Sequence, residues 1–425
     1  MESVPYLEFV VGFTILVYVF HTFLDVRQYK ALKLPTPPES VAHLFKGDLY
    51  EKTQIYSLDK WWFSMAHDAW ELVTGILTLA CGFLPWLWHA VSAAFSKVDW
   101  AKDGEIVHTI AFVLILSAVS IAMDLPWGLY RTFVLEERHG FNKQTPLIYF
   151  TDLLKQMLLG LLLIPPIVGV VTYILINAGR WLPLYLWGFF FVLVLCLMTI
   201  YPVLIAPLFN KFEILEEGSL KVQIEELASS LKFPLKKVYQ MDGCKRSAHS
   251  NAYMYGFFNN KRIVLYDTLI QQCTNEEVVS VLAHELGHWK MRHTMMSFAM
   301  GQALVLLQVL LFTFVRDSQP LFRSFGFLHA QPAFVSFILF QFISAPIEEV
   351  LHFVQNVVSR MFEFQADAFA VGHGHGEQLQ AALVKLEEKN KSPLNVDRWF
   401  SSYHYSHPPL PERLEAIRTS VKKRT

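Results

Sequence analysis

Long apolar runs dominate the chain and alternate with shorter polar segments. A helix needs about 20 mainly apolar residues to cross a bilayer. Because backbone groups inside a bilayer must hydrogen-bond to one another, we expect each sufficiently long run to be a helix. The seven expected spans are 4–24, 70–91, 106–130, 153–177, 181–208, 296–315 and 332–357. The pattern predicts an all-α membrane protein of about seven transmembrane helices.

Two polar blocks interrupt or follow the spans. In the first, EEGSLKVQIEELASSLKF predicts an amphipathic helix capped by Ser219, and KKVYQMDG and KRIVLYDTLI predict strands. The segment between these strands ends in an expected turn at Asn259 and Asn260. We expect a small β-hairpin or sheet, whose edge strand would bind an extended peptide. The expected organisation is five helices in 1–208, a catalytic region in 209–295, two helices in 296–357 and a helical C-terminal region in 358–425.

Basic residues are distributed unevenly between the expected loops. One set of loops holds Arg27, Lys30, Lys33, Lys46, Lys52, Lys60, Arg131, Arg138 and Lys143. The alternate loops hold Lys97, Lys102, Arg180, Arg316 and Arg323. By the positive-inside rule, the richer set is cytosolic. This places the N-terminus in a lumen, and 209–295 and the C-terminus in the cytosol.

Composition supports the membrane assignment. Of 425 residues, 53% are hydrophobic and 17% charged, against about 25% charged in soluble domains. With a net charge of −1, nothing indicates nucleic-acid binding by bulk electrostatics. The four cysteines are far apart, which indicates neither a disulfide framework nor a cysteine zinc site.

The segment VVSVLAHELGHWKMRHT carries the clearest chemical signal. His284 and His288 are spaced i, i+4, so one helical face presents both imidazoles, and Glu285 lies beside them. This H-E-x-x-H pattern is typical of zinc proteases, with the histidines as ligands and the glutamate as general base. A helix starting at Thr274 or Asn275 is expected. Gly287 is costly in a helix, and we expect it to leave room for a substrate.

A zinc ion needs a third protein ligand, and SRMFEFQADAFAVG supplies candidates. Glu363 and Asp367 share one face of an otherwise apolar helix, where an isolated charge is unfavourable. We assign Glu363 as the third ligand and Asp367 as the group that orients a ligand histidine. The alternative is that these carboxylates form salt bridges with Arg360 or Arg413.

Other polar residues have simpler interpretations. His293 is expected at the surface, and His373 and His375 in a loop. Glu348 and Glu349, deep in the seventh span, indicate an internal hydrated space. The prolines at 165, 166, 202 and 207 predict kinked helices.

Several longer segments resemble one known family. HELGHWK, EFQADAFA, HSNAYMYGFFNNKRIVLYDTL, YHYSHPPLPERL, DLPWGLYRTFVLEERHGFNKQT and YPVLIAPLFNKF are similar to segments of the type I CAAX prenyl endopeptidases. These are zinc metalloproteases of the endoplasmic reticulum membrane, also called farnesylated-protein converting enzymes. The resemblance spans nearly the whole chain. It is greatest to plant members, because the insertion that animal members carry before the zinc helix is missing.

The resemblance implies both a fold and a reaction. It implies seven helices around an intramembrane chamber with one inward-facing Zn²⁺. It also implies removal of the last three residues from farnesylated or geranylgeranylated CaaX proteins.

The resemblance further assigns roles to side chains outside the zinc motif. It implies that Asn251 holds the substrate backbone, that His407 is a substrate or oxyanion contact, and that Arg413 pairs with an acid near the zinc such as Asp367. The basic tail at 422–425 is similar to a retrieval signal of the endoplasmic reticulum.

Two other functions remain open at this stage. One is a membrane quality-control zinc protease that has the same catalytic residues and acts on misfolded proteins. The other is a metal-ion transporter, which would need its ligands near the middle of the membrane. His284 and His288 lie outside the apolar spans, next to Trp289 and Lys290, which favours a protease.

Overall fold

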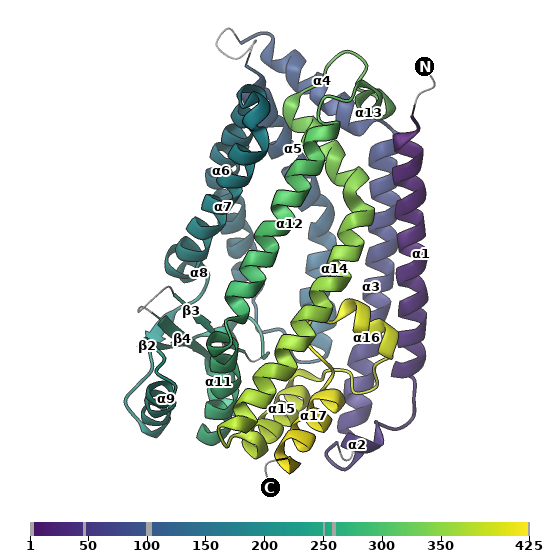
Figure 1. Ribbon diagram of the computed structural model, residues 1–425. Coiled ribbons are helices and arrows are strands. Elements are labelled where there is room, and N and C mark those ends of the chain that lie inside the picture. Colours follow the sequence, from purple (N-terminus) through teal and green to yellow (C-terminus); the bar gives the residue numbers. More distant parts are fainter. Residues whose placement is uncertain (1–3, 46–47, 99–103, 250, 257–260, 424–425) are drawn as a thin grey trace.

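The computed structural model describes residues 4–45, 48–98, 104–249, 251–256 and 261–423. Lys46, Lys102, the expected turn at Asn259 and Asn260, and the last two residues lie outside these ranges. Long helices lie along the long axis of the molecule (Figure 1). They are α1 (Tyr6–Leu32), α3 (Leu49–Ala80), α5 (Glu105–Tyr130), α6 (Pro146–Asn177), α7 (Leu182–Ile200), α12 (His293–Val315) and α14 (Ala333–Gly372).

The spans agree with the hydrophobic pattern, with one correction. Six helices of the described chain are long and apolar enough to cross a membrane, and a bent pair makes a seventh if it is taken as one span. This pair is α3 with α4 (Phe83–Phe95), which meet at an angle of 58°. The expected span over 70–91 is therefore not one continuous helix, because it is broken between α3 and α4. The chain turns at Gly82, whose φ of +63° suits a residue without a Cβ.

The spans bury few of their side chains against one another. Between 6% and 28% of the residues in each apolar window are buried. Most side chains of the spans therefore lie outside the packed cores. Glu348 and Glu349 on α14 contact protein groups: Glu348 lies 2.8 Å from Ser344 Oγ and 3.5 Å from Gln308 on α12. Glu349 accepts a hydrogen bond from Tyr403.

Shorter helices complete the structure. They are α2 (Glu39–Ala42), α8 (Ala206–Phe209), α9 (Ser219–Ser230), α10 (Asp267–Gln272), α11 (Asn275–Lys290), α13 (Gln319–Ser324), α15 (Gly376–Asn390), α16 (Arg398–His404) and α17 (Leu410–Lys422). The Ser219 side chain does not cap α9 as expected; its hydroxyl accepts a hydrogen bond from Asn275 at the start of α11. The sheet, α9, α11, α15 and α17 gather at the end where the C-terminus lies, opposite the N-terminus (Figure 1).

The sheet has four strands in the order β1-β2-β4-β3. These are β1 (Phe212–Ile214), β2 (Leu235–Met241), β3 (Ala252–Tyr255) and β4 (Lys261–Tyr266). The two strands expected from the sequence, β2 and β4, are neighbours but run parallel. The antiparallel partner of β4 is β3, which lies at the edge of the sheet. One hydrophobic core joins the sheet to α9, α11, α15 and α17, with Val278, Leu282 and Leu286 of α11 at its centre.

Candidate metal centre

The helix α11 begins where the sequence predicts. The Thr274 side chain accepts a hydrogen bond from the Glu277 backbone N–H, and the Glu277 carboxylate accepts one from the Thr274 N–H at 2.7 Å. This reciprocal pair satisfies two backbone donors at the helix start. Lys385 of α15 donates to the same carboxylate at 2.6 Å, which ties α11 to α15. One face of α11 packs into the hydrophobic core, and the face next to it carries His284 and His288.

The three candidate ligands come together. Nε2 of His288 lies 3.2 Å from Nε2 of His284 and 3.3 Å from Oε1 of Glu363 on α14. Nε2 of His284 lies 3.5 Å from Oε2 of Glu363. One ligand atom from each residue lies within 4.8 Å of the others. Two imidazole nitrogens and a carboxylate converging on one point suit a divalent cation with a fourth position left open.

Asp367 lies behind this cluster, one helical turn beyond Glu363. Its Oδ1 is 2.8 Å from Nδ1 of His284, the ring nitrogen that faces away from Glu363. Arg413 of α17 donates two hydrogen bonds to the same carboxylate, at 2.9 and 2.6 Å. Arg360 instead pairs with Glu412 at 2.7 Å. Glu363 thus faces the imidazoles and also lies 3.7 Å from Arg413, whereas Asp367 bridges His284 and the largely buried guanidinium of Arg413.

His293 belongs to the same cluster, and its expected surface position is wrong. It is 3% exposed, and its ring stacks on Phe362 with centroids 4.1 Å apart. Its Nδ1 lies 3.0 Å from Nδ1 of His288, and its Nε2 lies 2.9 Å from Oε1 of Gln365. Arg292 has a left-handed φ of +62°, which turns the chain between α11 and α12 and brings His293 back towards His288. No local sequence pattern indicates that turn.

Glu285 is half-buried beside the two histidines. Burial raises the pKa of its carboxyl above the ordinary range, and the neighbouring His284 and His288 partly offset this effect. A carboxylate with a raised pKa is a better proton acceptor near neutral pH.

His407 lies at the open side of the cluster. Its Nε2 is 3.3 Å from Oε1 of Glu363, and its side chain is 66% exposed. The preceding segment is fixed to α14, because Asn356 donates to the Tyr403 carbonyl at 2.6 Å and Arg360 donates to the Ser401 carbonyl at 3.0 Å. His407 is thus accessible, and α16, which precedes it, is anchored to α14.

Asn251 precedes the edge strand β3 and is exposed. Its Oδ1 accepts a hydrogen bond from the Ala252 N–H at 2.8 Å, and its carbonyl accepts one from the Tyr266 N–H at 3.1 Å. Within the part of the chain that the structure describes, Asn251 makes no hydrogen bond to His284, His288 or Glu363.

Gly287 has a different role from the expected one. A Cβ at this position would lie 3.0 to 3.2 Å from three carbon atoms of Phe369 on α14. The missing side chain therefore lets α11 and α14 approach closely, and Phe369 fills the space that we assigned to substrate. This close approach holds both histidines near Glu363.

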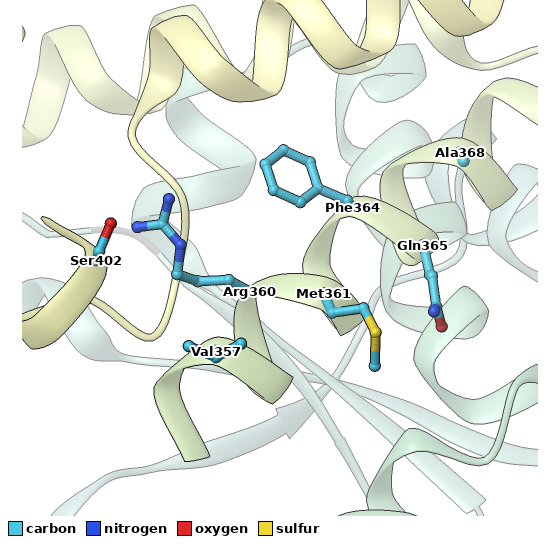
Figure 2. A pocket seen from close by; sticks show the side chains of 7 residues that line it. All are labelled: Val357, Arg360, Met361, Phe364, Gln365, Ala368 and Ser402. Atoms are coloured by element: carbon cyan, nitrogen blue, oxygen red, sulfur yellow. The ribbon is translucent and has the colours of Figure 1, made fainter. Parts of the chain in front are cut away.

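An open and mostly apolar pocket of about 480 Å³ runs along another face of α14. Figure 2 shows its lining side chains, with Phe364 and Met361 of α14 beside Arg360 and with Ser402 across from them. None of the candidate metal ligands lines it. Gln365, the partner of His293, is one of the residues that line it.

Comparisons with known proteins show the family to which the chain is similar. A family described as "CAAX prenyl protease N-terminal, five membrane helices" matches residues 28–211, and peptidase family M48 matches residues 215–421. The chain is 52% identical to the CAAX prenyl protease 1 homologs of Oryza sativa subsp. japonica and Arabidopsis thaliana, over 99% of this chain and 99% of each relative. It is 40% identical to the homolog of Homo sapiens, over 95% of this chain and 93% of that protein.

A solved structure gives the same fold. The crystal structure of S. mikatae Ste24p superposes with a TM-score of 0.93 at 36% identity, covering 98% of this chain and 100% of that one. The resemblance noted in the sequence is confirmed over the full length, and the helices enclose an intramembrane chamber as in that fold. The chain is a multi-pass membrane metalloendopeptidase that belongs to peptidase family M48, within its CAAX prenyl protease group.

Proposed function

We propose that this protein is a zinc endopeptidase that removes the last three residues from farnesylated or geranylgeranylated CaaX proteins. The single observation that carries the proposal is the convergence of His284, His288 and Glu363 at one end of a membrane-spanning fold. The names of the relatives, CAAX prenyl proteases in plants, animals and fungi, support the substrate class.

We assign the two imidazoles and the Glu363 carboxylate as zinc ligands. Nitrogen and oxygen donors of this kind, with a fourth position open, suit zinc in hydrolases. A zinc ion bound there would supply Lewis acidity, which lowers the pKa of water towards about 7 and polarises a carbonyl.

The side chains around the ligands have separate tasks in this proposal. The Glu285 carboxylate takes a proton from the attacking water and passes it to the nitrogen of the leaving peptide. His407 stabilises the charge that develops on the carbonyl oxygen. The free edge of β3, with Asn251 before it, would align the substrate backbone by strand addition.

Membrane embedding follows from the nature of the substrate. A prenyl chain partitions into a bilayer with about 0.8 kcal/mol per buried CH₂. A protease that spans the bilayer therefore meets its substrate where the substrate is concentrated.

We also propose that the site faces the cytosol from the endoplasmic reticulum membrane. Lys30 and Lys33 end α1, and Arg138 and Lys143 follow α5, at the end of the molecule that carries α11. Arg180 and Arg316 lie at the opposite, less basic end. This charge difference supports the orientation by the positive-inside rule. Accessibility of a C-terminal tag in sealed microsomes measures it; a protected tag would contradict it.

The decisive assay compares a farnesylated CaaX peptide with its unprenylated twin, using purified protein with and without chelator. We expect cleavage of the prenylated peptide only, loss of cleavage with chelator, and recovery on adding zinc. Glu285→Gln should abolish cleavage and retain zinc. Equal cleavage of both peptides would instead indicate a quality-control protease. Zinc flux into vesicles without cleavage would indicate a transporter.

A further inference from the structure

His288 presents its two ring nitrogens to different neighbours. Its Nε2 faces His284 and Glu363, whereas its Nδ1 lies 3.0 Å from Nδ1 of His293. A ring nitrogen binds a metal through its lone pair, and a neutral imidazole carries only one proton. If Nε2 binds the metal, the proton must be on Nδ1, and it then needs an acceptor. Among the described residues, only Nδ1 of His293 lies within hydrogen-bond distance of His288 Nδ1.

The state of His293 is fixed in turn by Gln365. For Nδ1 of His293 to accept a hydrogen bond, its own proton must be on Nε2. That nitrogen lies 2.9 Å from Oε1 of Gln365, an amide oxygen that accepts. If the Gln365 amide donated instead, every hydrogen bond would reverse. Nε2 of His288 would then carry a proton and lose its lone pair for the metal.

We infer that His293 and Gln365 are positioning residues that hold His288 in its metal-binding tautomer. The inference rests on the proposed function, because it assumes that His288 is a ligand. It parallels the contact between Asp367 and His284, so each candidate ligand imidazole has its own partner. Three residues of α14, at alternate positions 363, 365 and 367, then supply the third ligand and secure both imidazoles.

Packing alone is the competing explanation for a buried His293. The ring is 3% exposed and stacks on Phe362 at an interplanar angle of 8°. His293→Phe keeps an aromatic ring in the stack and removes the acceptor. His293→Asn loses the ring but places an amide oxygen close to the position of Nδ1. Gln365→Met keeps the side-chain length and removes the amide, without altering the stacked ring.

The experiment measures the zinc dissociation constant of each variant by chelator competition and the absorption spectrum of the Co²⁺-substituted protein. We expect about 10- to 100-fold weaker zinc binding and an altered Co²⁺ spectrum for His293→Phe and Gln365→Met. His293→Asn should bind zinc more tightly than His293→Phe. A purely structural role would give the opposite order, because Phe retains the stacking.

Three outcomes separate the possibilities. Parental zinc affinity and spectrum in both His293→Phe and Gln365→Met would overturn the inference. If His293→Phe does not fold, Gln365→Met decides alone. His284→Ala serves as the reference: if it binds zinc as tightly as the parent, the metal site of the proposed function is wrong, and the inference falls with it.

Discussion

Oδ1 of Asp367 lies 2.8 Å from Nδ1 of His284, although the two residues are 83 positions apart in the chain. The same carboxylate receives two hydrogen bonds from Arg413. Asp367 thus does two things: it orients the His284 ring, a candidate metal ligand, and it balances the charge of the largely buried Arg413 guanidinium. Substitutions in this pair should affect both folding and metal binding.

Asp367→Ala should be strongly destabilising, because it leaves the largely buried Arg413 without its bidentate partner. Removing one member of a buried pair costs about 3 to 5 kcal/mol. The double variant Asp367→Ala, Arg413→Leu should be less destabilised than Asp367→Ala alone, since no unpaired charge remains. Thermal unfolding in detergent measures this order. Additive losses in the double variant would contradict the coupling.

Gly287→Ala has two opposing effects. Helix propensity favours alanine by up to about 1 kcal/mol, whereas contact with the Phe369 ring predicts a loss of about 1 to 3 kcal/mol. We expect net destabilisation together with weaker zinc binding, because α11 must move away from α14. The double variant with Phe369→Leu should recover stability. A more stable single variant would show that the helices can separate without cost.

Metal-free protein should become less stable as pH rises from about 6.5 to about 9. Burial acts to lower the pKa of His284, but hydrogen bonds to Asp367 and Glu363 outweigh it and raise the pKa from 6.5 to about 9. Because the folded-state pKa is the higher one, the stabilisation from the protonated ring is complete below pH 6.5 and is lost through pH 9.

Melting temperatures of the zinc-free protein across this range measure the effect. Asp367→Asn should flatten the trend, since it removes one of the two anionic partners. Zinc-loaded protein is the control. Its melting temperature should not follow this trend, because the metal takes the place of the proton on His284. A zinc-free protein whose melting temperature rises between these pH values would contradict the assignment.

His407→Ala should separate catalysis from metal binding. His407 lies 3.3 Å from Glu363 but is not a member of the group whose ligand atoms converge. Loss of one group that stabilises an oxyanion lowers kcat by about 10²- to 10³-fold. We therefore expect such a loss in kcat for the prenylated peptide, with zinc affinity close to that of the parent. Substantial zinc loss would instead indicate that His407 is a ligand.

The sequence predicted features that depend on neighbouring residues along the chain. The apolar runs located the spans, because length and hydropathy are local properties that the bilayer requires. The start of α11 at Thr274 was predictable, because its capping box involves residues three positions apart. The bend at Gly82 was missed, because the hydrophobic run continues through the break.

Contacts between elements that are far apart in the chain could not be predicted from the sequence pattern. The order β1-β2-β4-β3 depends on which strands meet, and alternation of residues does not encode it. Gly287 was interpreted as space for a substrate, because the sequence does not indicate that Phe369 packs against it. His293 was placed at the surface, because the turn at Arg292 that returns it to His288 has no local signature.

The sequence by itself determined six of the seven expected membrane spans, because length and hydropathy are local properties. It also determined the pair of histidines on one helical face, because helical periodicity places residues four positions apart on one side. Only the tertiary structure decided which groups surround that pair. The packing of α14 against α11 brings Glu363, Gln365 and Asp367 to the imidazoles, and this packing depends on the close approach at Gly287 and on the shared core below it.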